Sequence, residues 1–224
     1  MQYGASVRED RKDGYKRMLL LGITMLFVLP TFLCPVASGA EETLIIYYSR
    51  TGKTRIVAET LQKNLGADML AIEDPKDRSG AWGYMKSAYD AFTHKHTPIQ
   101  PAELDLANHS FIIIATPIWS WNLSTPIHTL FEKNRFDGKK IVLITTANIH
   151  IMKYEEYGDD APFIKRFLKD YLRGKRAAAA AEVEKSGGEF IGHYHITTKE
   201  KTDREIIDET MKAYEYVLKT IPQQ

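Results

Sequence analysis

Cysteine is nearly absent from this chain: among its 224 residues there is one, Cys34. A single cysteine excludes an internal disulfide framework and a cysteine-cluster metal site. An excess of charge of one sign is also absent, since the chain has 30 Lys and Arg residues and 29 Asp and Glu residues. This balance offers no basic surface potential for binding nucleic acid. The content of 44% hydrophobic and 26% charged residues excludes a disordered or collagen-like chain and is typical of a globular domain.

The first forty residues have the layout of a signal peptide. A basic stretch precedes an apolar run over 18–33, and small residues follow that run. The run is shorter than the about 20 residues that a membrane helix needs, and Pro30 interrupts it. We therefore expect residues 1–40 to be removed near Ala40, with an uncleaved anchor as the alternative. The mature domain, 41–224, is then exported and lies in the periplasm or associates with the cell envelope.

Beyond this segment, short apolar runs alternate with longer amphipathic ones, which is the pattern of strands exchanging with helices. The run over 110–115 is apolar almost throughout, so we expect it to be buried on both faces of a sheet. Right-handed crossovers predict a single α/β domain with a five-stranded parallel sheet, in the order 2-1-3-4-5, and helices on both faces. The predicted strands are 43–49, 68–73, 110–115, 140–146 and 189–197, and the predicted helices are 53–65, 81–95, 124–133, 162–184 and 203–220.

The loop after the first strand is the first candidate site, because ligands of such sheets bind beyond the carboxyl ends of the strands. Between Ser49 and Thr54 it brings three hydroxyls beside the unpaired N–H groups of a helix N-terminus, an arrangement that suits phosphate. A Walker loop needs a glycine where Tyr47 stands, and no GxGxxG fingerprint occurs, so nucleoside-triphosphate hydrolysis is disfavoured. The alternative is that Thr51 and Thr54 only cap the helix.

The loop after the third strand, 116–123, carries two of the three tryptophans of the chain. One indole of the pair Trp119 and Trp121 can pack inward while the other faces the flat ring of a ligand. The alternative is that both indoles pack beneath the loop as a satellite of the core.

Three segments resemble the flavodoxins and flavodoxin-like FMN proteins, in particular the short bacterial type. YYSRTGKTRIVAETL, over 47–61, is similar to the phosphate loop and first helix of that family. FIIIATPIWSWNLSTPIHTLFE, over 111–132, resembles its third strand, flavin loop and following helix, and DGKKIVLITTAN, over 137–148, resembles its fourth strand and last flavin loop. The resemblance is close over 43–148 and elsewhere holds only in the order of elements. It implies a flavodoxin-like three-layer domain with FMN as its cofactor.

The resemblance also implies which residues surround FMN, and it implies no catalytic side chain or metal ligand. Two positions depart from the family: Lys53 replaces a neutral amide side chain, and the loop after 146 lacks the glycine found near the flavin in well-studied flavodoxins. The implied residues are Ser49, Thr51, Gly52, Lys53 and Thr54 at the 5'-phosphate, Thr116, Pro117, Ile118, Trp119 and Trp121 beside the isoalloxazine ring, and Thr146, Ala147, Asn148 and Ile149 along its other side.

Other residues of note receive no part in this site. The pairs His94/His96 and His193/His195 each fall on one face if the chain is extended, but no third ligand is predictable, so we expect no metal site. The segment 154–160 is either a lid over the cofactor or a solvated acidic loop. Three aromatic residues at the start of the second helix are interpreted as core: Trp82, Tyr84 and Tyr89.

Together these observations predict an exported redox protein that transfers electrons through bound FMN to a partner protein or to a small-molecule acceptor. The sequence does not separate one-electron shuttling from the two-electron reduction of a quinone or similar compound by an FMN-dependent reductase. A third possibility is a binding module of the same fold that holds no flavin, and the hydroxyls of the phosphate loop argue against it. A phosphate-ester hydrolase is disfavoured, because neither a nucleophile nor metal ligands accompany that loop.

Overall fold

The computed structural model describes residues 43–148 and 162–221. The signal peptide expected over 1–40, the site residue Ile149 and the segment 154–160 lie outside these ranges, so the expectations about them remain predictions. In the part of the chain that is described, no helix combines the length and the apolar character needed to cross a membrane.

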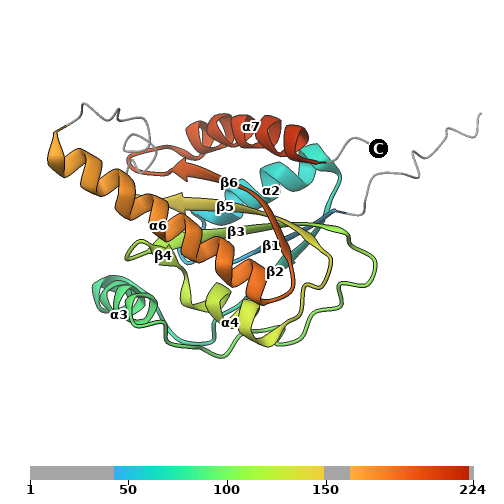
Figure 1. The fold of residues 1–224 in the computed structure, drawn as a ribbon, viewed down its shortest axis with the longest axis horizontal. Helices are drawn as coiled ribbons and strands as arrows, with labels where there is room; N and C mark the ends of the chain where they lie inside the picture. Colours follow the sequence, from blue (N-terminus) through green and yellow to red (C-terminus); the bar gives the residue numbers. More distant parts are fainter. Residues whose placement is uncertain (1–42, 149–161, 222–224) are drawn as a thin grey trace, which may run out of the picture. The chain divides into compact units, whose positions relative to one another are not determined.

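A parallel sheet forms the middle layer of the domain (Figure 1). Its strands follow the order β2-β1-β3-β5-β6, and a short sixth strand, β4, pairs antiparallel with β3 off this path. The predicted order 2-1-3-4-5 is thus confirmed for the five parallel strands. Their bounds, with β4 included, are β1 Thr43–Tyr47, β2 Asp68–Ala71, β3 Phe111–Trp119, β4 Asn122–Leu123, β5 Lys140–Ala147 and β6 Glu189–Thr197.

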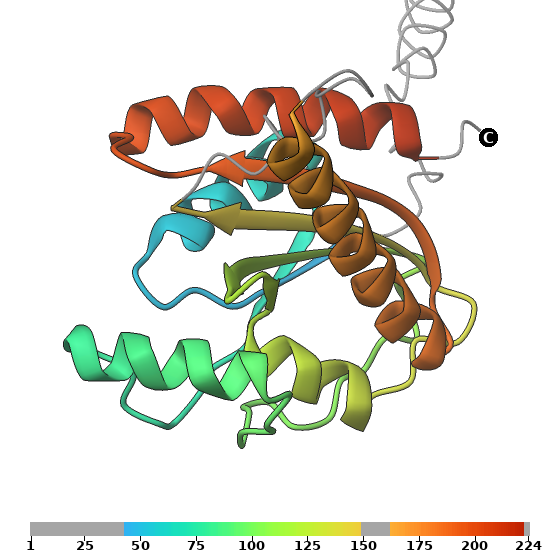
Figure 2. The same cartoon turned by 60° about the vertical axis from the view of Figure 1, so that its left-hand side comes forward.

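Helices cover both faces of the sheet, as Figure 2 shows: α2 and α7 lie together on one face, and α3, α4 and α6 lie on the other. Two of the predicted helices, 53–65 and 203–220, have the observed bounds, and the others differ by one to three residues at their ends. The observed helices are α2 Lys53–Leu65, α3 Gly80–Phe92, α4 Thr125–Lys133, α6 Phe163–Lys185 and α7 Asp203–Thr220.

The central strand β3 joins the two halves of the core. Every residue over 111–116 is buried, which confirms that this strand is covered on both faces. Because successive strand residues point to opposite faces, Ile112 and Ile114 pack with the side chains of α4 and α6, whereas Ile113 packs with those of α2 and α7.

The strand β3 is longer than the sequence predicts and ends at Trp119 instead of residue 115. Its parallel register with β5 continues as far as Pro117, which lies opposite Thr146. Ile118 and Trp119 then pair back with β4. The loop that the sequence assigns to the ligand therefore begins as regular sheet, which holds its residues in fixed positions.

The aromatic residues of α3 are exposed, so their interpretation as core is wrong. The helix instead turns toward the domain a face of small and polar residues. On that face the packing is tight at Gly83, where a Cβ atom would lie 2.2 Å from the backbone carbon of Arg78. The exposed fractions are 75% for Trp82, 58% for Tyr84 and 57% for Tyr89, and the buried residues are Gly83, Ser87, Asp90 and Ala91.

Candidate functional site

A cleft of about 540 Å³ opens where β1, β3 and β5 end, and we call it the strand-end cleft. It brings together the three loops that the sequence singles out. Among the described residues that line it there is no carboxylate, whereas two side chains are cationic, so the cleft suits an anionic ligand. The lining residues are Arg50, Thr51, Lys53, Thr54, Tyr84, Ala88, Pro117, Ile118, Trp119, Ser120, Trp121, Thr146, Ala147, Asn148 and Thr198.

Most of the predicted site residues line this cleft, and of those that the structure describes three do not. Ser49 and Gly52 face a neighbouring hollow of about 840 Å³, which shares Arg50 and Thr51 with the cleft but also carries the carboxylates of the loop after β2. Thr116 is fully buried, and its hydroxyl is hydrogen-bonded to that of Ser124 at 2.8 Å. Thr116 therefore supports the loop from within.

The start of α2 has the features of an anion site. Gly52 precedes the helix with a φ of 88°, a left-handed conformation that glycine adopts without strain. No side chain of the described residues caps this helix, and its first turn holds no acidic residue. The interpretation that Thr51 and Thr54 merely cap the helix is thus wrong.

The Oγ atom of Ser49, two residues beyond the end of β1, adds a second feature to this loop. It is buried, and no hydrogen-bond partner for it exists within 43–148 or 162–221. Buried polar atoms are normally satisfied, so an orphaned hydroxyl beside an uncapped helix start indicates a place for an external acceptor.

Two residues expected at the phosphate are engaged elsewhere. The hydroxyl of Thr54 lies 2.8 Å from that of Thr146, so this buried pair ties α2 to β5 below the cleft. The ammonium group of Lys53 donates to the carboxylate of Asp203 at 3.0 Å and to the carbonyl of Lys201 at 3.2 Å. The positive charge of Lys53 is consequently shared with the beginning of α7.

Arg50 is a site residue that the sequence reasoning missed. Its guanidinium donates to the carbonyl oxygen of Arg78 at 3.1 Å and lies over the ring of Tyr84, 5.4 Å from the centroid. In the described part of the chain it has no ion pair with a carboxylate, so it is better placed than Lys53 to meet an anion. Its position between Ser49 and Thr51, two residues already expected at the phosphate, could have predicted its place in the site.

The two indoles of the second loop have different surroundings. Trp119 is 6% exposed, packs edge-on against Tyr48 with centroids 5.5 Å apart, and lies beneath the guanidinium of Arg78 at 5.2 Å. Trp121 is half-buried in the cleft wall and meets the ring of Tyr171 at 6.3 Å. One indole thus packs inward and the other stands at the mouth of the cleft.

A buried ion network supports Trp119 from behind. Arg78 donates to Asp74 at 2.5 Å and to Asp90 at 3.1 Å, and the three side chains are at most 6% exposed. Burial, with the nearby Asp74 carboxylate, raises the pKa of Tyr48 to about 12, so its hydroxyl stays neutral. The sequence did not predict this network, because charged residues in and after a polar loop are normally expected to be exposed.

The two histidine pairs differ in the structure. His193 and His195 lie on one face of β6, as expected, and both rings reach the hydroxyl of Thr145, at 2.7 and 2.9 Å. Burial lowers the pKa of His193 to about 3, and Arg176 and His195 add to the effect. His94 and His96 follow the end of α3 and diverge, so the alternation expected of an extended segment does not apply to them.

Comparisons with known proteins agree with this architecture. Residues 42–161 match the family model described as flavodoxin. None of the curated proteins matches the chain. Among solved structures, a protein of Bacteroides uniformis described as a flavoprotein is 18% identical with a TM-score of 0.56, over 76% of this chain and 97% of that chain. A second such protein, from Bacteroides eggerthii, is 16% identical with a TM-score of 0.53, over 80% and 98%. At these identities the likeness shows the fold alone.

Proposed function

The chain belongs to the flavodoxin family, and from this premise we propose that it binds FMN in the strand-end cleft and transfers electrons through it. One observation carries the proposal: the buried hydroxyl of Ser49, which has no partner in the described ranges, lies beside the uncapped start of α2, at the hollow that adjoins the cleft and shares Arg50 and Thr51 with it. Leaving such a hydroxyl unsatisfied costs about 1–3 kcal/mol, and a phosphate oxygen would remove that cost. A helix N-terminus is also favourable for negative charge.

The residues of the first loop fit the phosphate end of FMN. Ser49 and Thr51 supply hydroxyls, the backbone after Gly52 supplies N–H groups, and Arg50 supplies a positive charge that pairs with no carboxylate in the described ranges. Gly52 has open space around the position of a Cβ atom, so the backbone there is accessible to a ligand. A hydrogen bond to a charged group contributes about 1.5–3 kcal/mol, so several of them suffice for tight binding.

The residues of the second and third loops fit the ring end. Pro117, Ile118 and Trp121 offer an apolar wall, and Ala147, at the end of the neighbouring strand β5, packs with Ile118 and Trp121 and is followed by Asn148. An aromatic wall of this kind contributes about 1–3 kcal/mol per stacked ring and excludes water from it. When bound, FMN supplies the exchange of one or two electrons.

We propose a redox partner protein or a small-molecule acceptor as the destination of the electrons. A quinone-type acceptor is favoured by one observation: the ring of Tyr84, 58% exposed, forms part of the cleft lining. An exposed aromatic ring beside the mouth of a cleft is suited to a second flat molecule. An FMN-dependent reductase is therefore the second candidate function, next to an electron shuttle.

The experiment that tests the proposal is a gel-filtration run of the purified protein after incubation with FMN. We expect the flavin to elute with the protein and its spectrum to change on binding. Adding a nicotinamide cofactor then separates the two functions: rapid bleaching followed by reoxidation with a quinone indicates a reductase, and absence of reaction indicates a shuttle. Protein that stays colourless would contradict the proposal and favour a binding module without flavin.

We also propose that residues 1–40 direct export, on the strength of the basic and apolar layout of that segment. The chain would then cross the membrane unfolded and take up FMN afterwards. Mass spectrometry of the envelope fraction should find an N-terminus near residue 41. A flavin-bound precursor with its N-terminus intact in the cytoplasm would contradict this route.

A further inference from the structure

A cluster of metal-ligating side chains lies on the α3, α4 and α6 side of the sheet, outside the strand-end cleft. His94 follows the end of α3, His128 belongs to the first half of α4, and Glu182 belongs to the last turns of α6. One ligand atom from each of the three lies within 4.8 Å of the others. We propose that this cluster binds a divalent transition metal ion of the zinc type.

His128 gives the strongest support to this proposal. The residue is 6% exposed, and its Nδ1 lies 2.5 Å from a carboxylate oxygen of Glu182. An ion held between Nδ1 and the Glu182 carboxylate would take both atoms as ligands, in place of the proton that they now share.

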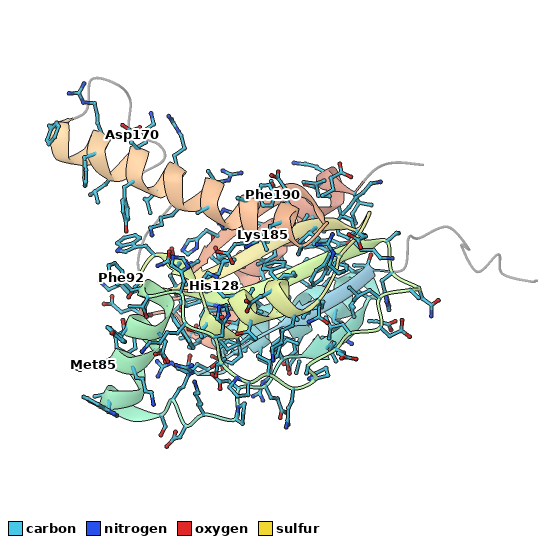
Figure 3. The ribbon with its side chains drawn as sticks, turned by 60° about the horizontal axis from the view of Figure 1, so that its bottom comes forward. Met85, Phe92, His128, Asp170, Lys185 and Phe190 are labelled. Carbon is cyan, nitrogen blue, oxygen red and sulfur yellow. The ribbon has the colours of Figure 1, made fainter. Side chains whose placement is uncertain are left out.

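His94 supplies the second imidazole. Its ring centroid lies 5.1 Å from that of His128, with the planes inclined by 64°. The residue has a φ of 50°, a left-handed conformation that histidine adopts more often than most residues other than glycine. This backbone turn directs the ring of an exposed residue toward a buried one, and the exposed side gives an ion a path of entry. Figure 3 shows His128 between the end of α3 marked by Phe92 and the end of α6 marked by Lys185.

The donor set selects the class of metal. Two imidazole nitrogens and one carboxylate match the ligands of zinc sites that retain an open position for water. Magnesium and calcium prefer ligand sets made only of oxygen, so the two histidines disfavour them. The chain supplies three ligands, from the residues after α3, from α4 and from α6, and a water molecule would complete a four-coordinate ion.

An ion at this position would affect how α3 packs on the rest of the domain. It would join the end of α3 to α4 and α6, and α3 also carries Tyr84 and Ala88 of the strand-end cleft. A bound ion would therefore hold one wall of the cleft against the body of the domain. The proposal does not depend on FMN, because none of its three ligands lines that cleft.

The test is calorimetric titration of the full chain, without a histidine tag and after treatment with a chelator, using Zn²⁺ alone. We expect a single ion per chain, a rise in Tm on binding, and tetrahedral absorption bands when Co²⁺ replaces Zn²⁺. Mg²⁺ should give none of these signals. Wild-type protein that takes up no Zn²⁺ would overturn the proposal.

Three variants localise the site. His94→Gly removes one imidazole and suits the left-handed backbone, so the fold is retained while the calorimetric signal and the Tm shift are lost. Glu182→Gln replaces a carboxylate ligand by a neutral amide, so Zn²⁺ binding should weaken by at least the about 10- to 100-fold that follows the loss of a group supporting a metal ligand. The control is His96→Ala, which removes a neighbouring histidine paired with Glu132 and should leave the affinity unchanged. Equal losses in His94→Gly and His96→Ala would also overturn the proposal.

Discussion

The phosphate end and the ring end of the proposed FMN site are built in different ways. The phosphate end is one continuous stretch, 49–54, and its features are backbone geometry, a helix start and adjacent hydroxyls. The ring end depends on contacts between distant parts of the chain: Trp119 rests on Tyr48 and Arg78, and Trp121 rests on Tyr171. We infer that changes at the phosphate end alter ligand affinity with little effect on folding, whereas changes behind the ring end alter the stability of the domain.

The largest effect is expected from Arg78→Met, which breaks the support of the ring end. The substitution leaves two carboxylates, Asp74 and Asp90, buried without a cation. Breaking a buried ion pair in this way lowers the free energy of unfolding by about 3–5 kcal/mol, which urea unfolding will measure. The matched control, Arg135→Met, breaks the exposed pair with Asp137 and should cost no more than about 1 kcal/mol. Similar losses in the two variants would show that the buried network does not support the domain.

The two indoles offer the next comparison. Trp119→Ala should lower the free energy of unfolding by about 3–5 kcal/mol, because it removes a large buried side chain. Trp121→Ala should cost less than half of that, and it should weaken FMN and riboflavin alike, by about 1–3 kcal/mol each. Chemical unfolding and fluorescence titration measure the two quantities. If Trp121→Ala is as unstable as Trp119→Ala and leaves flavin affinity unchanged, Trp121 is a core residue and not a wall of the ring site.

At the phosphate end, Ser49→Ala should separate affinity from stability. The variant loses a hydrogen bond to a charged group, so FMN should bind about 10- to 100-fold more weakly. Riboflavin lacks the phosphate and should bind as it does to the wild type. The ligand-free variant should be at least as stable as the wild type, because the substitution removes a buried hydroxyl that has no partner in the described chain. An equal loss for both flavins would place the phosphate elsewhere.

The smallest effect is expected from Lys53→Met. The ammonium group already pairs with Asp203, so its removal should weaken FMN by less than about fivefold, or 1 kcal/mol. Asp203→Asn is the companion variant: it frees the ammonium group, and FMN affinity should then rise slightly or stay constant. If Lys53→Met costs as much as Ser49→Ala, the lysine leaves Asp203 for the phosphate.

The fold could be predicted because its signals are local. The alternation of apolar and amphipathic runs located all five parallel strands, and the helix bounds 53–65 and 203–220 agree with the observed ones. The β4 pairing was missed, because two residues carry no periodic pattern. The aromatic residues of α3 were wrongly interpreted as core, because the residues on the buried face of this helix, Gly83, Ser87, Asp90 and Ala91, are small or polar and form no hydrophobic pattern.

The site could be predicted in outline and not in its contacts. The loops were located correctly because parallel strands end at one edge of the sheet. The bond between Thr54 and Thr146, and the pairing of Lys53 with Asp203, join residues far apart in sequence and leave no local signal. The same holds for the cluster around His128, since its partners lie on two other helices.

The central claim is that the phosphate group of FMN is held at the start of α2. Calorimetric titration of the wild-type protein with FMN and with riboflavin tests it most directly. The account predicts that FMN binds more tightly than riboflavin by roughly 100-fold, the equivalent of one or two hydrogen bonds to a charged group. Equal affinities for the two flavins, or no binding of either, would contradict it.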